Sequence, residues 1–319
     1  MSQSNSEEKS GTASMYGMPL LEAAKSAGLT ITAPAEPTDE EVSVNGFKFH
    51  YLDWGNKHLP HLLFIHGFAQ QAHSFDFAAL GLRDRFHVIS VDLRGHGDTD
   101  WSTDGSYLLS EYVADIALFV DALGLTDLSI CGLSLGGRVA FVYAADHPSV
   151  VRSLVVVDAA PDLNLSGSSR IRDFVQGEDE WDSFDDLVNH VAGYTRKLRP
   201  IEQIRGSVRR AAKELPNGRW TWKYDRVLRQ PRPKDPTFTT EYLWTFMDRV
   251  ACPMLLVRGV KSDVLTPEAA QAVLDRVSTA ELAVVEKAAH LVPGDNPVGF
   301  ADAVGPFFNK VLDGSSEAS

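Results

Sequence analysis

Short, almost continuous apolar runs alternate with longer segments of helical periodicity, and this alternation leaves the chain few folds. The runs cover residues 61–67, 86–97, 128–134, 151–161, 252–263 and 280–290. Strands that are apolar throughout are buried on both faces, and the helices between them provide the cover. The pattern therefore predicts an α/β fold built on a parallel sheet.

Two segments depart from this alternation. Residues 41–55 alternate on both sides of Asn45-Gly46, the strongest short-range signal for a β-hairpin. After the sixth strand, residues 162–248 hold helical patches, charged residues, aromatic residues and a proline cluster, but no run typical of a core strand. We therefore expect a mainly helical insertion that interrupts the sheet.

The expected domain organisation follows from these departures. Residues 17–161 and 249–315 form the α/β core, and residues 162–248 form the insertion. Residues 1–16 are small and polar, so we expect a disordered tail. The chain has 319 residues, within reach of one α/β domain with an insertion.

Composition excludes several classes of function. The formal net charge is −13, which argues against a nucleic-acid-binding protein and leaves no basic segment for an anionic membrane. No stretch approaches the length of a membrane span, and the N-terminus lacks a signal-peptide pattern, so a cytoplasmic location is expected. Cys131 and Cys252 form no metal or redox motif and are expected to be buried free thiols.

The sequence GLSLG at residues 132–136 matches the pattern G-x-S-x-G. In this pattern a serine lies on a strained turn from strand to helix, and glycine on each side permits close backbone packing. Here an apolar run precedes Ser134 and a helical segment follows it. The helix N-terminus favours negative charge that develops at the serine. Ser134 is therefore the candidate nucleophile.

A serine hydroxyl needs a base, and the base needs a carboxylate that orients it. His290 follows the last strand, at the strand end where α/β active sites lie. His66 ends a strand that precedes Ser134, and His96 lies in a glycine-containing turn. Asp263 follows the penultimate strand and is the expected acid, although a helix N-cap is its simpler interpretation. Asp158, at the end of the strand VVVD, is the reserve acid.

The proposed chemistry also needs donors for an oxyanion, which are commonly two backbone N–H groups. One is expected from Leu135, directly after the serine. The other is expected from the loop after residues 61–67, most simply from the amide of Phe68, because Gly67 lets the loop turn back over the site.

Five segments together resemble the α/β-hydrolase superfamily, specifically cap-domain serine hydrolases similar to small-molecule esterases. They read HGF, DLRGHGDTD, GLSLGG, SDVLTPE and AAHLVPGDNP, at residues 66–68, 92–100, 132–137, 262–268 and 288–297. The resemblance covers roughly residues 41–315. It implies an eight-stranded, mostly parallel sheet with a helical cap, and no cofactor or metal.

The resemblance also implies roles for further residues. Asp92, Arg94 and His96 would support the site, and Arg138 would pair with buried polar groups. The cap would roof the pocket, lined by Trp181, Trp220 and Trp222. Basic residues of the cap could attract an acidic substrate, although a solvated helix face explains them more simply; they are Arg170, Arg172, Arg196 and Lys197.

The expected activity is carboxylesterase-like: hydrolysis of a small-molecule ester, lactone or amide through Ser134, His290 and Asp263. Serine at the nucleophile position argues against haloalkane dehalogenases and epoxide hydrolases, which resemble this chain but use aspartate there. A carbon–carbon bond hydrolase of aromatic degradation is the second interpretation. A ligand receptor on the same fold is a third, and repeated turnover would exclude it.

Overall fold

The computed structural model describes residues 20–162, 164–195, 198–230 and 235–316. The expected tail at residues 1–16 lies outside this part of the chain, as do Arg196 and Lys197.

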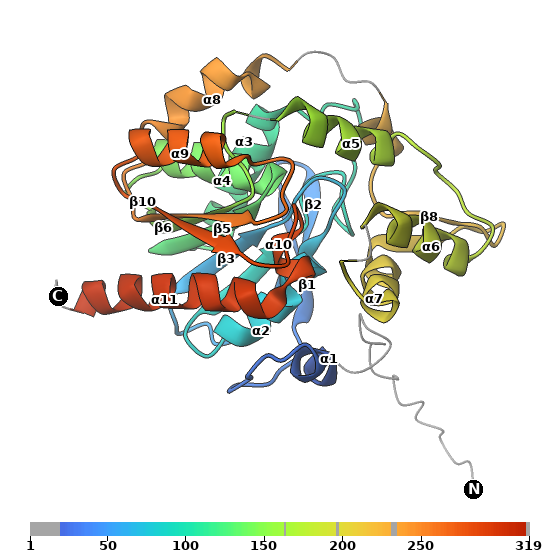
Figure 1. The fold of residues 1–319 in the computed structure, drawn as a ribbon, viewed down its shortest axis with the longest axis horizontal. Coiled ribbons are helices and arrows are strands. Elements are labelled where there is room, and N and C mark those ends of the chain that lie inside the picture. The colour runs from blue at the N-terminus through green and yellow to red at the C-terminus, as the bar shows by residue number, and fades with distance from the viewer. Residues whose placement is uncertain (1–19, 163, 196–197, 231–234, 317–319) are drawn as a thin grey trace, which may run out of the picture.

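Within the described residues, eight strands form one sheet in the order β1-β2-β4-β3-β5-β6-β9-β10 (Figure 1). Strands β1 and β2 run antiparallel to their neighbours, and the pairs from β4 to β10 are parallel. The strands are β1 (Thr38–Val44), β2 (Phe47–Asp53), β3 (His61–Ile65), β4 (His87–Val91), β5 (Leu128–Leu133), β6 (Val151–Val157), β9 (Met254–Gly259) and β10 (Ala280–Val285). The expected mostly parallel eight-stranded sheet is confirmed.

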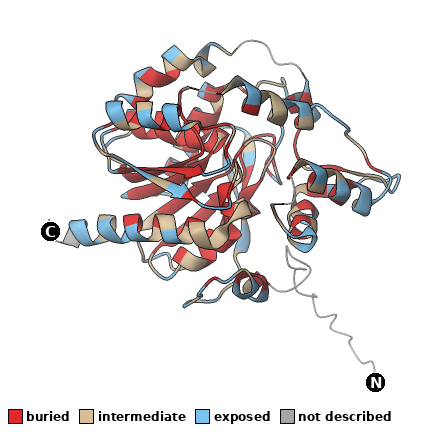
Figure 2. Ribbon diagram, in the orientation of Figure 1, coloured by how far each residue is buried: buried red, intermediate tan, exposed pale blue. Residues whose placement is uncertain are grey.

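Helices cover both faces of the sheet (Figure 1). One face packs against α3 (Leu109–Ala122), α4 (Leu135–Asp146), α8 (Thr240–Met247) and α9 (Pro267–Arg276). The other face packs against α1 (Leu20–Ser26), α2 (Asp76–Leu82) and α11 (Pro297–Ser316). Figure 2 shows the buried residues concentrated in the sheet, between the two helical layers, and in α4 of one layer. Burial on both faces explains the continuous apolar runs of the parallel strands.

The β1–β2 hairpin forms as its turn residues predict. Asn45 and Gly46 both have positive φ, 49° and 81°, which is the backbone conformation of a type I′ turn. Val44 pairs with Phe47 across this turn.

The insertion between β6 and β9 contains more than helices. Its α-helices are α5 (Leu165–Val175), α6 (Phe184–Tyr194), α7 (Ile201–Ala211) and α8. Two short strands, β7 (Ala212–Glu214) and β8 (Trp220–Trp222), form a separate antiparallel pair that the sequence pattern did not predict. Short 3₁₀ turns η2 (Arg226–Arg229) and η3 (Pro236–Phe238) lead towards α8; another, η1 (Ala72–Phe75), precedes α2 in the core.

None of the helices in the described ranges has the length and apolar character that crossing a membrane requires.

Candidate active site

Ser134 occupies the turn between β5 and α4 in a strained backbone conformation. Its φ is 54° and its ψ is −110°, a region that non-glycine residues rarely adopt. Its N–H donates to the carbonyl of Val157 on the neighbouring strand β6, at 2.9 Å. The packing of β5 against α4 maintains this conformation. As a result, the serine side chain projects beyond the end of the sheet.

The glycines around Ser134 are required by close backbone contacts. A Cβ on Gly132 would lie 2.2 Å from the carbonyl oxygen of Gly136, and a Cβ on Gly136 would lie 2.1 Å from that of Ile65. Both distances are far below a normal contact. The first residues of α4 therefore lie directly against β5 and the end of β3, and only glycine fits at both positions.

His290 follows β10 and contacts Asp158, which directly follows β6. The distance from His290 Nδ1 to Asp158 Oδ2 is 2.7 Å, and both side chains are buried. Asp158 also accepts from the hydroxyl of Ser262 at 2.5 Å. Because a carboxylate only accepts hydrogen bonds, the Nδ1 of His290 carries its hydrogen. The Nε2 atom is then left as the acceptor that a general base requires.

The expectation that Asp263 orients His290 is not met. Asp263 lies in the loop after β9, and its carboxylate accepts two hydrogen bonds of 2.8 Å from the guanidinium of Arg170 on α5. Among the described residues, the carboxylate in contact with His290 is that of the reserve acid, Asp158. The simpler interpretation of Asp263 is also wrong, because the N-cap of α9 is Thr266.

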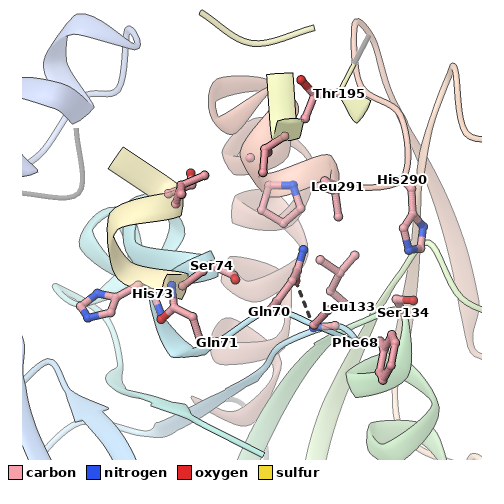
Figure 3. A pocket seen from close by; sticks show the side chains of 18 of the residues that line it. Phe68, Gln70, Gln71, His73, Ser74, Leu133, Ser134, Thr195, His290 and Leu291 are labelled. Atoms are coloured by element: carbon pink, nitrogen blue, oxygen red, sulfur yellow. Dashed lines mark hydrogen bonds between the residues drawn. The ribbon is translucent and has the colours of Figure 1, made fainter. Parts of the chain in front are cut away.

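Ser134 and His290 line the same pocket (Figure 3). In this view the imidazole lies next to the serine side chain, at one end of the cavity. Residues of the core loop after β3 and of the insertion line the rest, and the cavity volume is about 160 Å³. The geometry thus brings together Ser134, His290 and Asp158 from the ends of three strands.

The loop after β3 curls over Ser134. A turn joins the N–H of Gln70 to the carbonyl of Gly67 at 3.2 Å, and Ala69 has a positive φ of 59°. The Gln70 side chain accepts from the N–H of Gly67 at 3.1 Å (Figure 3, dashed line). Phe68 lines the pocket between them, beside Ser134. Leu135 is the first residue of α4, where N–H groups have no partner within the helix.

His66 supports this loop from below and is held in one tautomer. Its Nδ1 lies 2.7 Å from the carbonyl of Gly67, and its Nε2 accepts from the N–H of Leu93 at 2.9 Å. A protonated ring could not accept that second bond. Burial lowers the pKa of His66, although the charge of Asp92 opposes this. His66 is therefore a neutral structural residue.

The segment at residues 92–100 supports the site through buried polar contacts, as expected. Asp92 accepts from His50 Nδ1 at 2.7 Å and from the N–H of Ala72 at 2.6 Å. The Arg94 guanidinium makes a bidentate ion pair with Asp115. The ring of His96 packs edge-on against Phe68, with 5.8 Å between ring centroids. These contacts hold the segment at residues 92–100 against the loop after β3.

Arg138 on α4 is buried and donates to the carbonyl of Ala160 at 3.0 Å, which agrees with its expected pairing with buried polar groups. Burial lowers its pKa to about 10, while the charge of Asp158 opposes the shift. The guanidinium therefore places positive charge beneath the strand that carries Asp158.

Of the three tryptophans expected in the pocket, only Trp222 lines it. Trp181 and Trp220 instead pair through their backbones, with N–H to O distances of 3.0 and 2.8 Å. Trp181 also packs edge-on against Trp222, with centroids 5.5 Å apart. Trp181 is thus buried inside the insertion, Trp220 packs beside it and is only partly buried, and the insertion lines the pocket with residues of α5, α6 and α7 and with Trp222 of β8.

The cysteines carry no reactive chemistry. Cys131 is fully buried in β5, as expected, and burial raises its pKa well above the ordinary value. Cys252 is only partly buried, and burial raises its pKa to about 11. Thiols with raised pKa are poor nucleophiles.

One group of described residues has the composition of a metal site. A nitrogen of His50 and carboxylate oxygens of Asp92 and Asp98 lie within 4.8 Å of one another. However, His50 and Asp92 are hydrogen-bonded to each other, and Asp92 also accepts from the N–H of Asp98 at 3.0 Å. None of the three lines the pocket. The group is a hydrogen-bonded support rather than a ligand set.

Comparison with known proteins identifies the family of this chain. Residues 60–297 match the family model described as "alpha/beta hydrolase fold". The chain is 30% identical over 294 residues to esterase Rv0045c of Mycobacterium tuberculosis, covering 89% of this chain and 93% of that protein. It is 29% identical over 270 residues to the sn-1-specific diacylglycerol lipase ABHD11 of Mus musculus, covering 81% and 84%.

A solved structure of the Mycobacterium tuberculosis esterase superposes with a TM-score of 0.75 at 28% identity, covering 92% of this chain and 98% of that one. These matches confirm the expected family, the expected fold and the expected class of enzyme, a hydrolase of the carboxylesterase type.

Proposed function

Because the chain belongs to the α/β-hydrolase fold family, we propose that it cleaves a small-molecule carboxylic ester through an acyl-enzyme formed on Ser134. The observation that carries the proposal is the shared pocket, in which the strained Ser134 meets a histidine already paired with Asp158. A nucleophile, a base and an orienting acid are the parts that acyl transfer needs.

In the first step, His290 Nε2 accepts the proton of Ser134 as the serine oxygen attacks the ester carbonyl. Asp158 holds the tautomer with the hydrogen on Nδ1 and stabilises the imidazolium that forms. The backbone N–H groups of Phe68 and Leu135 bind the oxyanion. The C–O bond to the leaving alcohol then breaks, and His290 returns its proton to that oxygen.

In the second step, water replaces the alcohol. His290 accepts a proton from the water as its oxygen attacks the acyl carbon, and the tetrahedral intermediate again lies on the N–H groups of Phe68 and Leu135. The bond to Ser134 breaks, the serine oxygen recovers its proton, and the carboxylic acid leaves. No other residue needs to change its protonation state.

The insertion, residues 162–248, acts as the cap of this site. The pocket is lined by core residues on one side and by residues of α5, α6, α7 and β8 on the other. A cavity of about 160 Å³ is comparable with one that holds a single aromatic ring, so a short or compact acyl group fits best.

The test is steady-state release of p-nitrophenol from acetate and butyrate esters. We expect repeated turnover by the wild type and a loss of about 10³-fold or more in kcat for Ser134→Ala and for His290→Ala. Ser278→Ala and His58→Ala remove the same groups at exposed positions and serve as matched controls.

Normal turnover by Ser134→Ala would overturn the proposal. A single acylation without turnover would favour the ligand receptor. Cleavage of a vinylogous diketone, with no ester hydrolysed, would favour the carbon–carbon bond hydrolase.

A further inference from the structure

Arg199 lines the pocket with a largely buried side chain, and among the described residues none forms a hydrogen bond with it. Arg199 lies between α6 and α7, one residue before Pro200, the N-cap of α7. Its side chain is only 9% exposed, and it contributes to the pocket wall together with Gly294 and Leu291 next to the catalytic histidine. Its local sequence does not distinguish it from the other basic residues of the insertion.

The contacts of Arg199 do not satisfy the hydrogen-bond donors of its guanidinium. Within the part of the chain that the structure describes, its one ionic contact is with Asp295, at 3.5 Å between Nε and Oδ1. That separation is too long for a good hydrogen bond, and the buried Nε has no acceptor. A buried guanidinium without acceptors is costly, because it has lost water and gained little in return.

Asp295 also holds the loop that carries His290. Its Oδ2 atom accepts from the N–H of Ala289 at 3.0 Å, which ties it to the loop that carries His290. Burial raises the pKa of Asp295, while the charge of Arg199 opposes the shift. The ion pair thus orients Arg199 at the edge of the catalytic loop and leaves its terminal Nη groups for a ligand.

The wall around Arg199 is polar and open beside the guanidinium. Gln203 and Ser207, four and eight residues further on, also line the pocket from α7. A Cβ on Gly294 would lie 3.2 Å from Nη1 of Arg199, so glycine leaves the guanidinium room there. The apolar wall lies elsewhere, on Ile171, Phe174 and Val191.

We propose that Arg199 binds a carboxylate of the substrate, so that the preferred substrates are half-esters of dicarboxylic acids. This rests on the proposed ester hydrolysis at Ser134. A planar carboxylate matches the two-pronged donor face of a guanidinium. A phosphate dianion shares this chemistry but fits less well, because the buried carboxylates of Asp76 and Asp295 lie in or beside the same pocket.

The experiment compares p-nitrophenyl butyrate with the mono-p-nitrophenyl esters of succinate and glutarate. We expect the wild type to show a higher kcat/KM for one of the half-esters than for butyrate. In Arg199→Gln the ratio of half-ester to butyrate should fall about 10- to 100-fold, the range for a charge-assisted hydrogen bond. Arg199→Lys should recover part of the ratio.

Arg205→Gln is the matched control, because it removes an arginine charge from the neighbouring helix α7. The side chain of Arg205 is 40% exposed and pairs with Asp185 outside the pocket. This variant should leave the ratio unchanged. An equal loss on all esters in Arg199→Gln would overturn the proposal and assign the residue to the histidine loop. A wild type without preference for either half-ester would overturn it as well.

A binding measurement separates this proposal from ester hydrolysis itself. By titration calorimetry, glutarate should bind wild type more tightly than butyrate does, and Arg199→Gln should lose that difference, whether or not any ester turns over. Equal binding of glutarate by both proteins would overturn the assignment. Stronger competition by inorganic phosphate than by glutarate would overturn the choice of a carboxylate.

Discussion

The turn around Ser134 and the insertion at residues 162–248 are held in place by different forces. At the turn, backbone lies against backbone: an added Cβ on Gly136 would meet the carbonyl oxygen of Ile65 at 2.1 Å. Packing in the insertion is uneven: a Cβ on Gly193 of α6 would meet nothing within 4 Å, whereas one on Gly167 of α5 would meet the carbonyl oxygen of Asp263 at 2.1 Å.

Away from the contact at Gly167, side-chain contacts hold much of the insertion together. Glu180 makes ion pairs with Arg219 at 2.9 Å and with Arg226 at 2.6 Å. The guanidinium of Arg209 lies 4.6 Å from the ring centroid of Phe184 and 5.2 Å from that of Trp220. Contacts of this kind contribute little individually when they are partly exposed.

This difference between the turn and the insertion implies that they tolerate substitution to different degrees. Backbone contacts at the turn tolerate almost no substitution, so the position of Ser134 is fixed. Side-chain contacts in the insertion can be exchanged one at a time, so the shape and charge of the pocket wall can change without disturbing Ser134. Three measurements would break or sharpen this comparison.

The largest effect is expected for the acid. Asp158→Asn should reduce kcat about 10³- to 10⁴-fold, because an amide at the end of β6 favours the wrong tautomer of His290. Asp263→Asn removes a carboxylate bound to Arg170 of the insertion and should change kcat only a few-fold. Steady-state kinetics on one ester measures both. A larger loss in Asp263→Asn would mean that the loop after β9, not the end of β6, supplies the acid.

The next effect concerns stability. Gly136→Ala should lower the free energy of unfolding by about 3 kcal/mol or more, because the new methyl group would overlap the backbone of β3. Gly193→Ala, in a helix with free space, should raise it by about 0.5–1 kcal/mol. Urea denaturation of both variants gives the two values. Equal and small changes would show that the turn is not held by backbone contact.

The smallest effect concerns the polar support beneath the pocket. Burial lowers the pKa of His50, but hydrogen bonds to Asp92 and Asp39 outweigh it and raise the pKa to about 8. A histidine whose folded pKa exceeds its unfolded value of about 6.5 stabilises the fold fully below pH 6.5. That stability, about 2 kcal/mol, is lost as the pH rises through about 8.

His50→Gln should therefore lose most stability relative to wild type at pH 6 and least at pH 9, which urea denaturation at both values would measure. A difference that is the same at both pH values would contradict the ionic role of His50.

Local sequence patterns were sufficient to predict those features of the structure that depend on residues close together in the chain. The Asn45-Gly46 hairpin, the alternation of strands and helices, and the strained serine between glycines are of this kind. Choosing between Asp158 and Asp263 required the order of the strands in space. Both follow apolar strands, but only β6 leads its terminal carboxylate beneath the loop after β10, while the longer loop after β9 carries Asp263 out to Arg170.

The pocket wall could not be predicted for a related reason. Nothing in the local sequence distinguishes Arg199 from Arg170 or Arg205, since each is a basic residue of the insertion. Their different environments depend on which side chains they meet when α5, α7 and the segment before α7 pack together. Likewise nothing local distinguishes Trp181 and Trp220 from Trp222. Trp220 and Trp222 both lie in β8, which is too short to show a period, and Trp181 pairs with Trp220.

The arrangement of the site also has a consequence for folding. Ser134, Asp158 and His290 follow β5, β6 and β10, and the parallel pairings from β5 to β10 join segments far apart in sequence. Such non-local pairings form slowly, because the intervening loops must close first. These three residues come together only when β6 has paired with β9 and β9 with β10, so the recovery of activity after denaturation should report on the pairing of distant strands.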